Sequence, residues 1–546
     1  MELSIGLITL NAKYIHSSLS LRYLRNAARR AGYKNVWIRE YVINQPTWQI
    51  AAEIRKCRPD VLGLSVYIWN RAQSFELIER LKKHDPSLGI VLGGPEISFE
   101  PGLSEDYTLI SGEGENKWVE YLNYRRRGET PPAPVLNRWN TYGEDAPDLL
   151  PPYIEEDYPD LRDRIVYFET SRGCPYLCSF CLSALDKTVR YFEEESVNRQ
   201  IGQLVRAGVK RIKFVDRTFN LKPQRMRELM RRLSRFQGVS FHFEVVAELL
   251  SPDLLAFLAT VPEGMFQFEI GIQTTSGDTQ SLIQRRQNNE KLFGTLRELV
   301  RQNRIHFHCD LIFGLPGETL EDNLKSFEEV MALKPHELQL GFLKFLPGAP
   351  IRSLIEDHRY EFQSTPPYEV ISHKDLSADD ILYLKKFCEV FDLFYNSKRF
   401  RFSIDRLLGS WGAVDLFHYL LEYMERRNLL FRSHSLEDQY RIFFDAFSLE
   451  TQPAGADLLK LDYLYAQRTY HLPRFMRTLA PPHHPSGTKT WPGDGKTLMV
   501  PFRHEILFHN GDVSLKPSSG PCYYAIVHPR ENSGYLRQPA ITRVLD

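Results

Sequence analysis

Short apolar runs alternate with amphipathic stretches through residues 1–120 of the chain. The apolar runs are rich in Val, Ile and Leu and cover residues 3–10, 36–42, 61–67, 89–93 and 108–111. Segments with the helical spacing of apolar positions lie between them, at residues 20–31, 46–56 and 72–83. This alternation predicts a parallel, doubly wound sheet of the Rossmann-like type. Ligands of such sheets bind at the carboxyl ends of the strands.

The residues that follow the predicted strands are therefore candidates for binding a ligand. They are Thr9, Leu10 and Asn11 after the first strand, Ser65, Tyr67, Trp69 and Asn70 after the third, Gly93, Gly94, Pro95 and Glu96 after the fourth, and Gly112, Glu113 and Gly114 after the fifth. The G-x-G-x-x-G motif of dinucleotide-binding sheets is absent after the first strand, where residues 6–12 read GLITLNA.

A second alternation of strands and helices begins at about residue 164. Its predicted strands are residues 165–170, 211–215, 240–246, 265–273, 306–313 and 338–345. Its predicted helices are residues 193–207, 223–236, 252–259, 289–303 and 320–333. Six strands with crossover helices predict a partial (βα)₆ barrel of the TIM type, whose active site lies at the carboxyl ends of the strands.

The remaining segments differ from both alternations. A stretch rich in Pro, Asp and Glu predicts a linker, and an aromatic stripe of Phe387, Phe391 and Phe394 predicts a helical core beyond the barrel. The tail from residue 497 predicts strands, with a hairpin turn at residues 509–512. We therefore divide the chain into an N-terminal sheet domain (1–127), a linker (128–163), a barrel (164–350) and a mainly helical C-terminal domain with a terminal β segment (351–546).

The composition indicates which kinds of partner the protein binds and which cellular compartment it occupies. Lys plus Arg equals Asp plus Glu at 69 each, so nothing in the net charge attracts nucleic acid. The sequence holds no apolar run long enough for a membrane span and no secretory signal at its start. Seven cysteines, three of them clustered, fit a metal site in a reducing cytoplasm better than a disulfide framework.

The clustered cysteines lie in the segment SRGCPYLCSFC, residues 171–181, which we call the cysteine loop. Cys174, Cys178 and Cys181 provide three soft ligands, one fewer than a structural zinc site uses. Three cysteines can hold a 4Fe–4S cluster that leaves one iron free for another molecule. The loop follows the first predicted barrel strand, where barrel active sites lie. A structural metal knuckle or three buried thiols are the alternatives.

The spacing C-x₃-C-x₂-C after the first barrel strand resembles the radical S-adenosylmethionine (SAM) superfamily over residues 164–350. The resemblance implies that the three cysteines bind a 4Fe–4S cluster, that its free iron chelates SAM, and that Phe180 packs near the adenine. Asp216 stands where the superfamily has a Gly-Gly-Glu-type motif for the SAM amino group. The other implied SAM contacts are the inward-facing Glu244, Glu269 and Gln273, and Asp310 in the segment DLIFGLPGE. For each acid taken singly, an ordinary salt bridge is the alternative.

The strand ends of residues 1–120 are similar to those of the cobalamin-binding domain that precedes many radical SAM barrels. The resemblance implies that their glycine-rich loops let the backbone approach the corrin closely. The motif D-x-H-x-x-G, whose histidine binds cobalt, is absent. Tyr67 or Trp69 would then cover the lower face of the corrin, although Trp69 could instead belong to the buried core.

The whole arrangement resembles the cobalamin-dependent radical SAM family, in a branch with a C-terminal domain of unassigned function. This implies an enzyme that methylates an unactivated carbon of a small-molecule or peptide substrate, through methylcobalamin and a 5′-deoxyadenosyl radical. A reducing partner such as flavodoxin or ferredoxin is also implied. A cyclase or rearrangement enzyme, a degenerate cobalamin domain and an iron–sulfur carrier or sensor are the alternatives.

Overall fold

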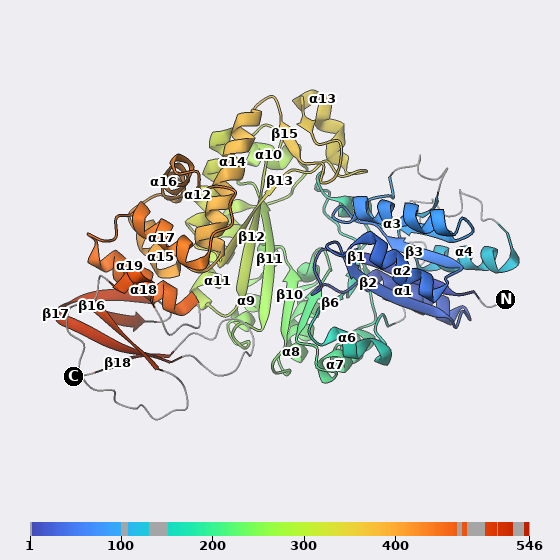
Figure 1. The fold of residues 1–546 in the computed structure, drawn as a ribbon, viewed down its shortest axis with the longest axis horizontal. Helices are drawn as coiled ribbons and strands as arrows, with labels where there is room; N and C mark the ends of the chain where they lie inside the picture. The colour runs from blue at the N-terminus through green and yellow to red at the C-terminus, as the bar shows by residue number, and fades with distance from the viewer. Residues whose placement is uncertain are drawn as a thin grey trace. The chain divides into compact units, whose positions relative to one another are not determined.

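The computed structural model describes residues 3–99, 107–129, 151–466, 472–477, 497–509, 512–527 and 540–544. The chain divides into two compact units. The first unit consists of Met1–Ser326 with Leu333–Ala378, and the second of Phe327–Ala332 with Asp379–Asp546. The residues of both units can be followed by colour in Figure 1. Residues 130–150, most of the predicted linker, lie outside the described residues.

A five-stranded sheet opens the first unit, with the strand order β2-β1-β3-β4-β5 and all neighbours parallel. The strands are β1 (Ile5–Asn11), β2 (Val36–Val42), β3 (Val61–Ser65), β4 (Gly89–Gly93) and β5 (Thr108–Ile110). The helices are α1 (Leu19–Arg30), α2 (Thr47–Cys57), α3 (Arg71–His84) and α4 (Glu115–Arg127).

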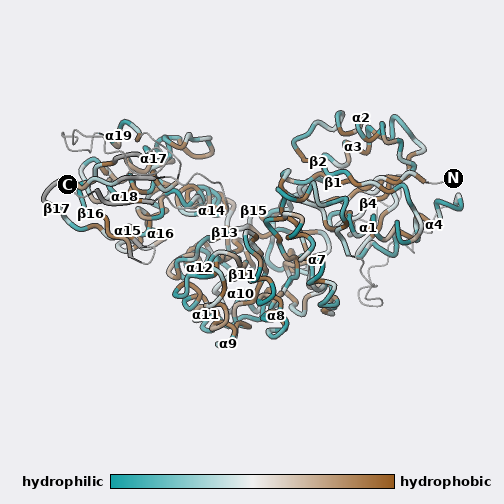
Figure 2. The backbone as a smooth tube through the Cα atoms, turned by 90° about the horizontal axis from the view of Figure 1, so that it is seen from below, coloured by the Kyte–Doolittle hydropathy of each residue, from teal (hydrophilic) through white to brown (hydrophobic). Residues whose placement is uncertain are grey.

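Apolar residues bury both faces of this sheet. Leu21 of α1 and Trp118 of α4 belong to one core cluster, whereas Ile50 of α2 and Leu77 of α3 belong to another. Figure 2 shows the apolar strand β1 between these layers. Every residue of β1 is buried, as expected for a parallel strand that is covered on both sides. The predicted doubly wound sheet is confirmed.

Six parallel strands with the order β13-β12-β11-β10-β9-β6 form the partial barrel. The strands are β6 (Ile165–Phe168), β9 (Arg211–Phe214), β10 (Ser240–Glu244), β11 (Phe266–Gln273), β12 (His306–Phe313) and β13 (Glu337–Phe342). The crossover helices are α7 (Glu194–Arg206), α8 (Pro223–Leu233), α9 (Pro252–Leu258), α11 (Asn289–Gln302) and α12 (Leu320–Met331). The predicted (βα)₆ architecture is therefore confirmed.

Side chains alternate strictly along the barrel strands. In β11, Phe266 and Phe268 are fully buried, while Gln267 between them and Glu269 after them are only partly covered. The same alternation runs through β10 and β12. Successive residues of a strand point to opposite faces, so one face carries the apolar core and the other carries polar side chains. The polar faces of neighbouring strands meet in the barrel interior.

The first unit continues past the predicted barrel boundary at residue 350, as far as Ala378. The added segment includes α13 (Ile355–His358), β14 (Glu361–Phe362) and β15 (Val370–Ser372). Backbone hydrogen bonds tie it to the barrel: Ile351 N donates to Ser179 O at 2.8 Å, and Val370 N donates to Leu343 O at 2.9 Å. These long-range bonds place residues 351–378 in the same compact unit as the barrel.

The second unit is helical with a small antiparallel sheet. Its helices are α14 (Ala378–Phe391), α15 (Arg401–Leu408), α16 (Ala413–Arg426), α17 (Leu436–Ala446), α18 (Pro453–Ala466) and α19 (Arg474–Arg477). Its strands are β16 (Thr497–His509), β17 (Asp512–Val527) and β18 (Ala540–Val544).

The sequence predictions for this unit are confirmed where the structure describes them. Phe387, Phe391 and Phe394 are all buried, as the aromatic stripe predicts. His509 pairs with Asp512 across the hairpin, although the two predicted turn residues between them lie outside the described residues. No helix in the described ranges combines the length and apolar character needed to cross a bilayer.

Candidate active site

The cysteine loop follows β6 directly, at the carboxyl end of that strand. Cys174 and Cys178 are buried, Cys181 is partly exposed, and none of the three forms a disulfide. Gly173 adopts φ +90°, and a Cβ there would lie 2.2 Å from the carbonyl oxygen of Thr188. Glycine is thus required for the turn that presents Cys174.

The spacing of the three sulfurs argues against a single metal ion. Among the described residues, the three thiols do not form a group whose ligand atoms all lie within 4.8 Å of one another. One zinc ion with bonds of about 2.3 Å cannot bridge sulfurs more than about 4.6 Å apart. A cluster, in which each cysteine binds a different iron, accommodates this wider spacing better than a single zinc ion does.

Asp216 holds the start of the cysteine loop rather than facing an open site. Its fully buried carboxylate accepts hydrogen bonds from Thr170 N at 2.9 Å, Thr170 Oγ1 at 2.7 Å and Ser171 Oγ at 2.6 Å. Burial raises the pKa of Asp216, and these donors oppose the shift. Asp216 thus positions the start of the loop, and its expected contact with the SAM amino group stays a prediction.

Two donors lie beside the cluster thiols. Thr218 Oγ1 is 3.6 Å from the sulfur of Cys174, and Arg285 Nη1 is 3.8 Å from the sulfur of Cys178. Burial raises the pKa of the Cys178 thiol, and the Arg285 guanidinium opposes that shift. The sequence does not single out Arg285, because it lies more than 100 residues beyond the cysteine loop with no motif around it. Phe180 is partly exposed beside these thiols.

The predicted inward acids Glu244, Glu269 and Asp310 all lie on the polar faces of their strands. Glu244 pairs with Arg217 at 3.7 Å, so an ordinary salt bridge accounts for part of its environment. Burial and the nearby Glu269 raise the pKa of Asp310 to about 7, and its Oδ1 has no hydrogen-bond partner. Gln273 takes φ +69° and its buried Oε1 also lacks a partner among the described residues. Asp310 and Gln273 thus offer unsatisfied polar atoms, as a ligand site requires.

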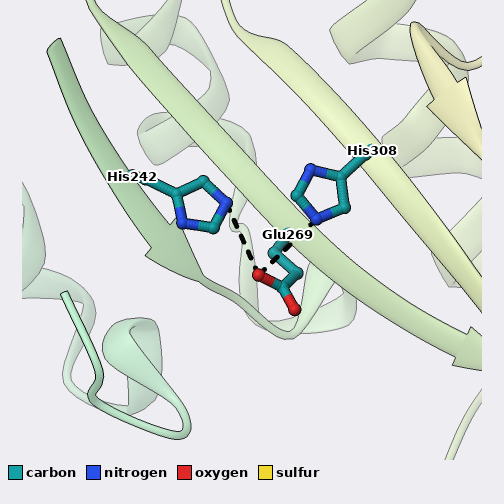
Figure 3. Close-up of side chains that lie close together, drawn as sticks. All are labelled: His242, Glu269 and His308. Atoms are coloured by element: carbon teal, nitrogen blue, oxygen red, sulfur yellow. Dashed lines mark ion pairs between the residues drawn. The ribbon is translucent and has the colours of Figure 1, made fainter. Parts of the chain in front are cut away.

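Glu269 has close polar neighbours on three strands, and Figure 3 shows the two histidines among them. Its Oε2 lies 2.9 Å from Lys213 Nζ, and 3.5 Å from Nε2 of both His242 and His308. Burial opposes the ionisation of Glu269, but His308 and Lys213 outweigh it and hold the pKa well below its usual range. Burial lowers the pKa of His242 to about 3. The sequence predictions do not include these two histidines, although their period-two spacing from Glu244 and Asp310 indicates that they share the same strand face.

Glu318, at the end of the segment that begins with Asp310, gives a pH-dependent prediction. It is buried and accepts a short hydrogen bond from Thr274 Oγ1, and burial raises its pKa to about 7 from 4.5. The unfolded chain loses this proton near pH 4.5, whereas the folded chain keeps it until about pH 7. The free energy of unfolding should therefore fall by about 3 kcal/mol across that window.

We expect Glu318→Gln to remove this part of the pH dependence, since an amide does not titrate. Thermal unfolding at about pH 5 and about pH 8 measures it: the Tm of the wild type should drop more between the two than that of the variant. Glu321→Gln, in the exposed first turn of α12, is the matched control. An equal drop in Glu318→Gln and wild type would contradict the prediction.

At the carboxyl edge of the N-terminal sheet, the loops after β1 and β3 come together as predicted. Thr9 Oγ1 donates to Ser65 O at 3.3 Å, and Asn70 Nδ2 donates to Leu10 O at 3.0 Å. The side chain of Leu10 is in the core, so only its backbone reaches the edge. Asn11, the last residue of β1, is buried and donates from Nδ2 to His16 O at 3.0 Å.

Tyr67 and Trp69 form a flat aromatic pair at this edge. Their rings are stacked at 4.5 Å with only 5° between the planes, and Trp69 is 44% exposed. The alternative that Trp69 belongs to the buried core is therefore wrong. Gly94 on the neighbouring loop has φ +111°, and a Cβ there would lie 2.4 Å from Val66 O. A stacked pair with an exposed Trp69 and a partly buried Tyr67, beside a glycine-only backbone, fits a large planar ligand.

The acids predicted at this edge are engaged in salt bridges within the first unit. Glu96, beside the exposed Pro95, is buried and accepts hydrogen bonds from Arg71 and from the hydroxyl of Tyr368. Glu113, between the partly covered Gly112 and Gly114, pairs with Arg190 at 2.5 Å. Gly93, which ends β4, pairs with Ser65 of β3.

One further ion pair joins the edge to the cysteine loop. Arg172 Nη2, two residues before Cys174, lies 2.7 Å from Glu115 at the start of α4. Arg172 also pairs with Glu169 at 2.8 Å. The carboxyl edge of the N-terminal sheet and the cysteine loop thus face each other within one compact unit.

The N-terminal sheet domain and the barrel each match a known protein family. A family described as a B12 binding domain matches residues 5–122, and the radical SAM superfamily matches residues 168–330. The chain combines a B12-binding domain with a radical SAM domain. The predicted cofactors are thereby confirmed: cobalamin for the sheet, and SAM with a 4Fe–4S cluster for the barrel. A third family, described as a protein of unknown function (DUF4080), matches residues 356–491.

Curated relatives match about half of this chain at moderate identity. The cobalamin-dependent radical SAM methyltransferase TokK of Streptomyces tokunonensis is 28% identical over 352 residues, covering 56% of this chain and 50% of that protein. The hopanoid C-3 methylase of Methylococcus capsulatus is 25% identical over 319 residues, covering 54% of this chain and 60% of that protein. The chain therefore spans about half the length of the curated relatives it matches.

Solved structures support the architecture. The cobalamin-dependent SAM radical enzyme OxsB with aqua-cobalamin bound has a TM-score of 0.60 at 15% identity, covering 87% of this chain and 79% of that chain. The methyltransferase TsrM from Kitasatospora setae, with cobalamin and a 4Fe–4S cluster bound, has a TM-score of 0.54 at 17% identity, covering 68% of this chain and 82% of that chain. At these identities the likeness establishes the fold of the B12-binding and radical SAM domains.

Proposed function

We propose that this chain is a cobalamin-dependent radical SAM methyltransferase that methylates an unactivated carbon of a small-molecule substrate. SAM, the cluster and cobalamin supply the radical and methyl-transfer chemistry when bound. An sp³ carbon has no lone pair for polar attack, so this chemistry needs a radical. The protein has to hold its cofactors near one substrate position and exclude competing reactions.

The observation that carries this proposal is the ion pair between Arg172 and Glu115. It connects the residue two positions before the first cluster cysteine to the edge where the B12-binding domain presents Tyr67, Trp69 and Gly94. A second pair, Arg190 with Glu113, supports the same contact. Both charges of the Arg172 pair are largely buried, at 15% and 13% side-chain exposure, so breaking it would leave an uncompensated charge.

Other residues of the chain have roles in this proposal that follow from their surroundings. Cys174, Cys178 and Cys181 hold the cluster, and Asp216 fixes the loop that carries them. Arg285 has its guanidinium beside Cys178, which suits a carboxylate such as that of SAM bound at the cluster. Asp310 and Gln273 contribute their unsatisfied oxygens to ligand hydrogen bonds. Tyr67 and Trp69 lie against one face of the corrin.

Anaerobic reconstitution with iron, sulfide, cobalamin and SAM tests the proposal, with a low-potential reductant or a flavodoxin or ferredoxin as electron donor. We expect S-adenosylhomocysteine to form only when cobalamin is loaded, and 5′-deoxyadenosine only when the cysteines are intact. Formation of 5′-deoxyadenosine without S-adenosylhomocysteine would reject methyl transfer and favour a rearrangement. Failure to retain any corrin would reject the role of cobalamin.

A further inference from the structure

Three side chains from adjacent barrel strands point toward one position in the barrel interior, and we call them the His–Glu–His group. His242 lies on β10, Glu269 on β11 and His308 on β12 (Figure 3). One ligand atom from each residue lies within 4.8 Å of the other two. The group is distinct from the cysteine loop.

The distances within the group suit a metal ion better than hydrogen bonds alone. Nε2 of His242 and Nε2 of His308 each lie 3.5 Å from the same oxygen, Oε2 of Glu269. Hydrogen bonds to a carboxylate are usually about 2.7–2.9 Å long. Ligands of a tetrahedral ion with bonds of about 2.1 Å are about 3.4 Å apart, which follows from the tetrahedral angle. Two of the three distances between ligand atoms thus match the spacing around a single ion, and the third pair of ligand atoms lies within 4.8 Å.

The three side chains of the His–Glu–His group are partly exposed to solvent. A bound ion would therefore keep coordination positions for a further ligand. The side chains of His242, Glu269 and His308 are 13%, 25% and 18% exposed. Two imidazoles and one carboxylate are the donors of catalytic zinc and non-haem iron sites, which keep at least one open position. Because the fourth position is free of protein ligands within the group, an oxygen or nitrogen donor can occupy it.

Lys213 is the main competitor of a cation at this position. Its ammonium lies 2.9 Å from Oε2 of Glu269 and balances the carboxylate charge when no metal is bound. A bound ion would require Lys213 to move to the outer oxygen of the carboxylate, where hydrogen-bonding partners of metal ligands usually lie. The lysine should therefore weaken metal binding without supplying a ligand.

We propose that His242, Glu269 and His308 bind a divalent transition metal of the zinc or ferrous class, separate from the iron–sulfur cluster, with an open position for an oxygen or nitrogen donor. This site does not depend on methyl transfer. It requires only the geometry of the three strands.

Zinc binding to the full chain, with its cluster and cobalamin loaded, tests this proposal. After treatment with a chelator, the protein is titrated with Zn²⁺ and its zinc content is measured by mass spectrometry. We expect about one zinc per chain, and X-ray absorption at the zinc edge should show nitrogen and oxygen ligands at about 2.0–2.2 Å. Zinc bound through sulfur at about 2.3 Å would place it at the cysteine loop and overturn the proposal.

Substitutions separate this site from other zinc-binding positions. His242→Ala and His308→Ala are expected to weaken zinc binding at least about 100-fold, while the matched control His306→Ala, earlier on β12, retains it. Equal zinc content in all variants, or no zinc in the wild type, would overturn the proposal. Lys213→Met leaves all three proposed ligands in place and removes the ammonium that competes for Oε2 of Glu269, so it should tighten binding at least about tenfold. Unchanged or weaker binding in Lys213→Met would also count against the site.

Discussion

Cys178→Ala is expected to abolish SAM cleavage and to prevent assembly of the 4Fe–4S cluster. The Cys178 sulfur is one of three thiols on a loop whose backbone is held by Asp216 and by the turn at Gly173. Without Cys178, only two cysteines of the loop remain to bind the cluster. The described cysteine Cys309 cannot replace the lost ligand, because it is fully buried on β12, away from the loop. Iron content and the visible absorption of the reconstituted protein measure cluster assembly, and 5′-deoxyadenosine measures SAM cleavage.

Cys57→Ala is the matched control for this experiment. Cys57 ends α2 in the B12-binding domain, is partly exposed, and makes only a long 3.7 Å contact with Glu53 O. We expect iron content, cobalamin content and SAM cleavage in Cys57→Ala to match the wild type. Full iron content and SAM cleavage in Cys178→Ala would show that the cysteine loop is not the cluster site.

Gly94→Ala is expected to abolish cobalamin retention while leaving the cluster intact. The added Cβ would lie 2.4 Å from Val66 O and 3.1 Å from Val66 N, and the backbone has φ +111°. Positive φ disfavours alanine by about 1–2 kcal/mol, and the contact with rigid backbone adds to that. The loop after β4 must therefore move away from the loop after β3, which separates Gly94 from the aromatic pair of Tyr67 and Trp69.

Corrin per chain after gel filtration measures the effect of Gly94→Ala, and iron per chain tests whether the barrel is intact. Gly294→Ala is the matched control, because a Cβ at this helical position meets no atom within 4 Å. Alanine there is expected to raise the Tm slightly, since glycine is unfavourable inside a helix. Stoichiometric corrin in Gly94→Ala would place the ligand away from this edge.

Much of the fold could be predicted because each strand and helix depends on the pattern of apolar and polar residues within its own segment. The alternation of apolar and polar positions in β11, with Phe266 and Phe268 against Glu269, already indicates a strand with two different faces. The cysteine loop is equally local, since three thiols within one turn-rich segment must lie close together whatever surrounds them. The meeting of several loops at the carboxyl edge of the N-terminal sheet could also be predicted, because carboxyl ends of parallel strands share one side of a sheet.

The partners of individual side chains could not be predicted in the same way. Glu96 is buried under Tyr368, whose position in the sequence gives no hint of the contact. Asp216 accepts two hydrogen bonds from Thr170 and one from Ser171, the first residue of the cysteine loop. Arg285 lies beside Cys178 because a later segment of the barrel returns to the loop. Each contact joins segments whose separation in the chain is large.

By itself, the amino-acid sequence of this protein determined which segments become strands and helices, and that three thiols share one loop. These features depend on neighbouring residues, whose spacing is set by the backbone. Only the tertiary structure decided that Arg172 would join the cysteine loop to Glu115, and that His242, Glu269 and His308 would meet at one position. These side-chain contacts depend on the register and closure of strands that are distant in the chain, and no local sequence pattern encodes them.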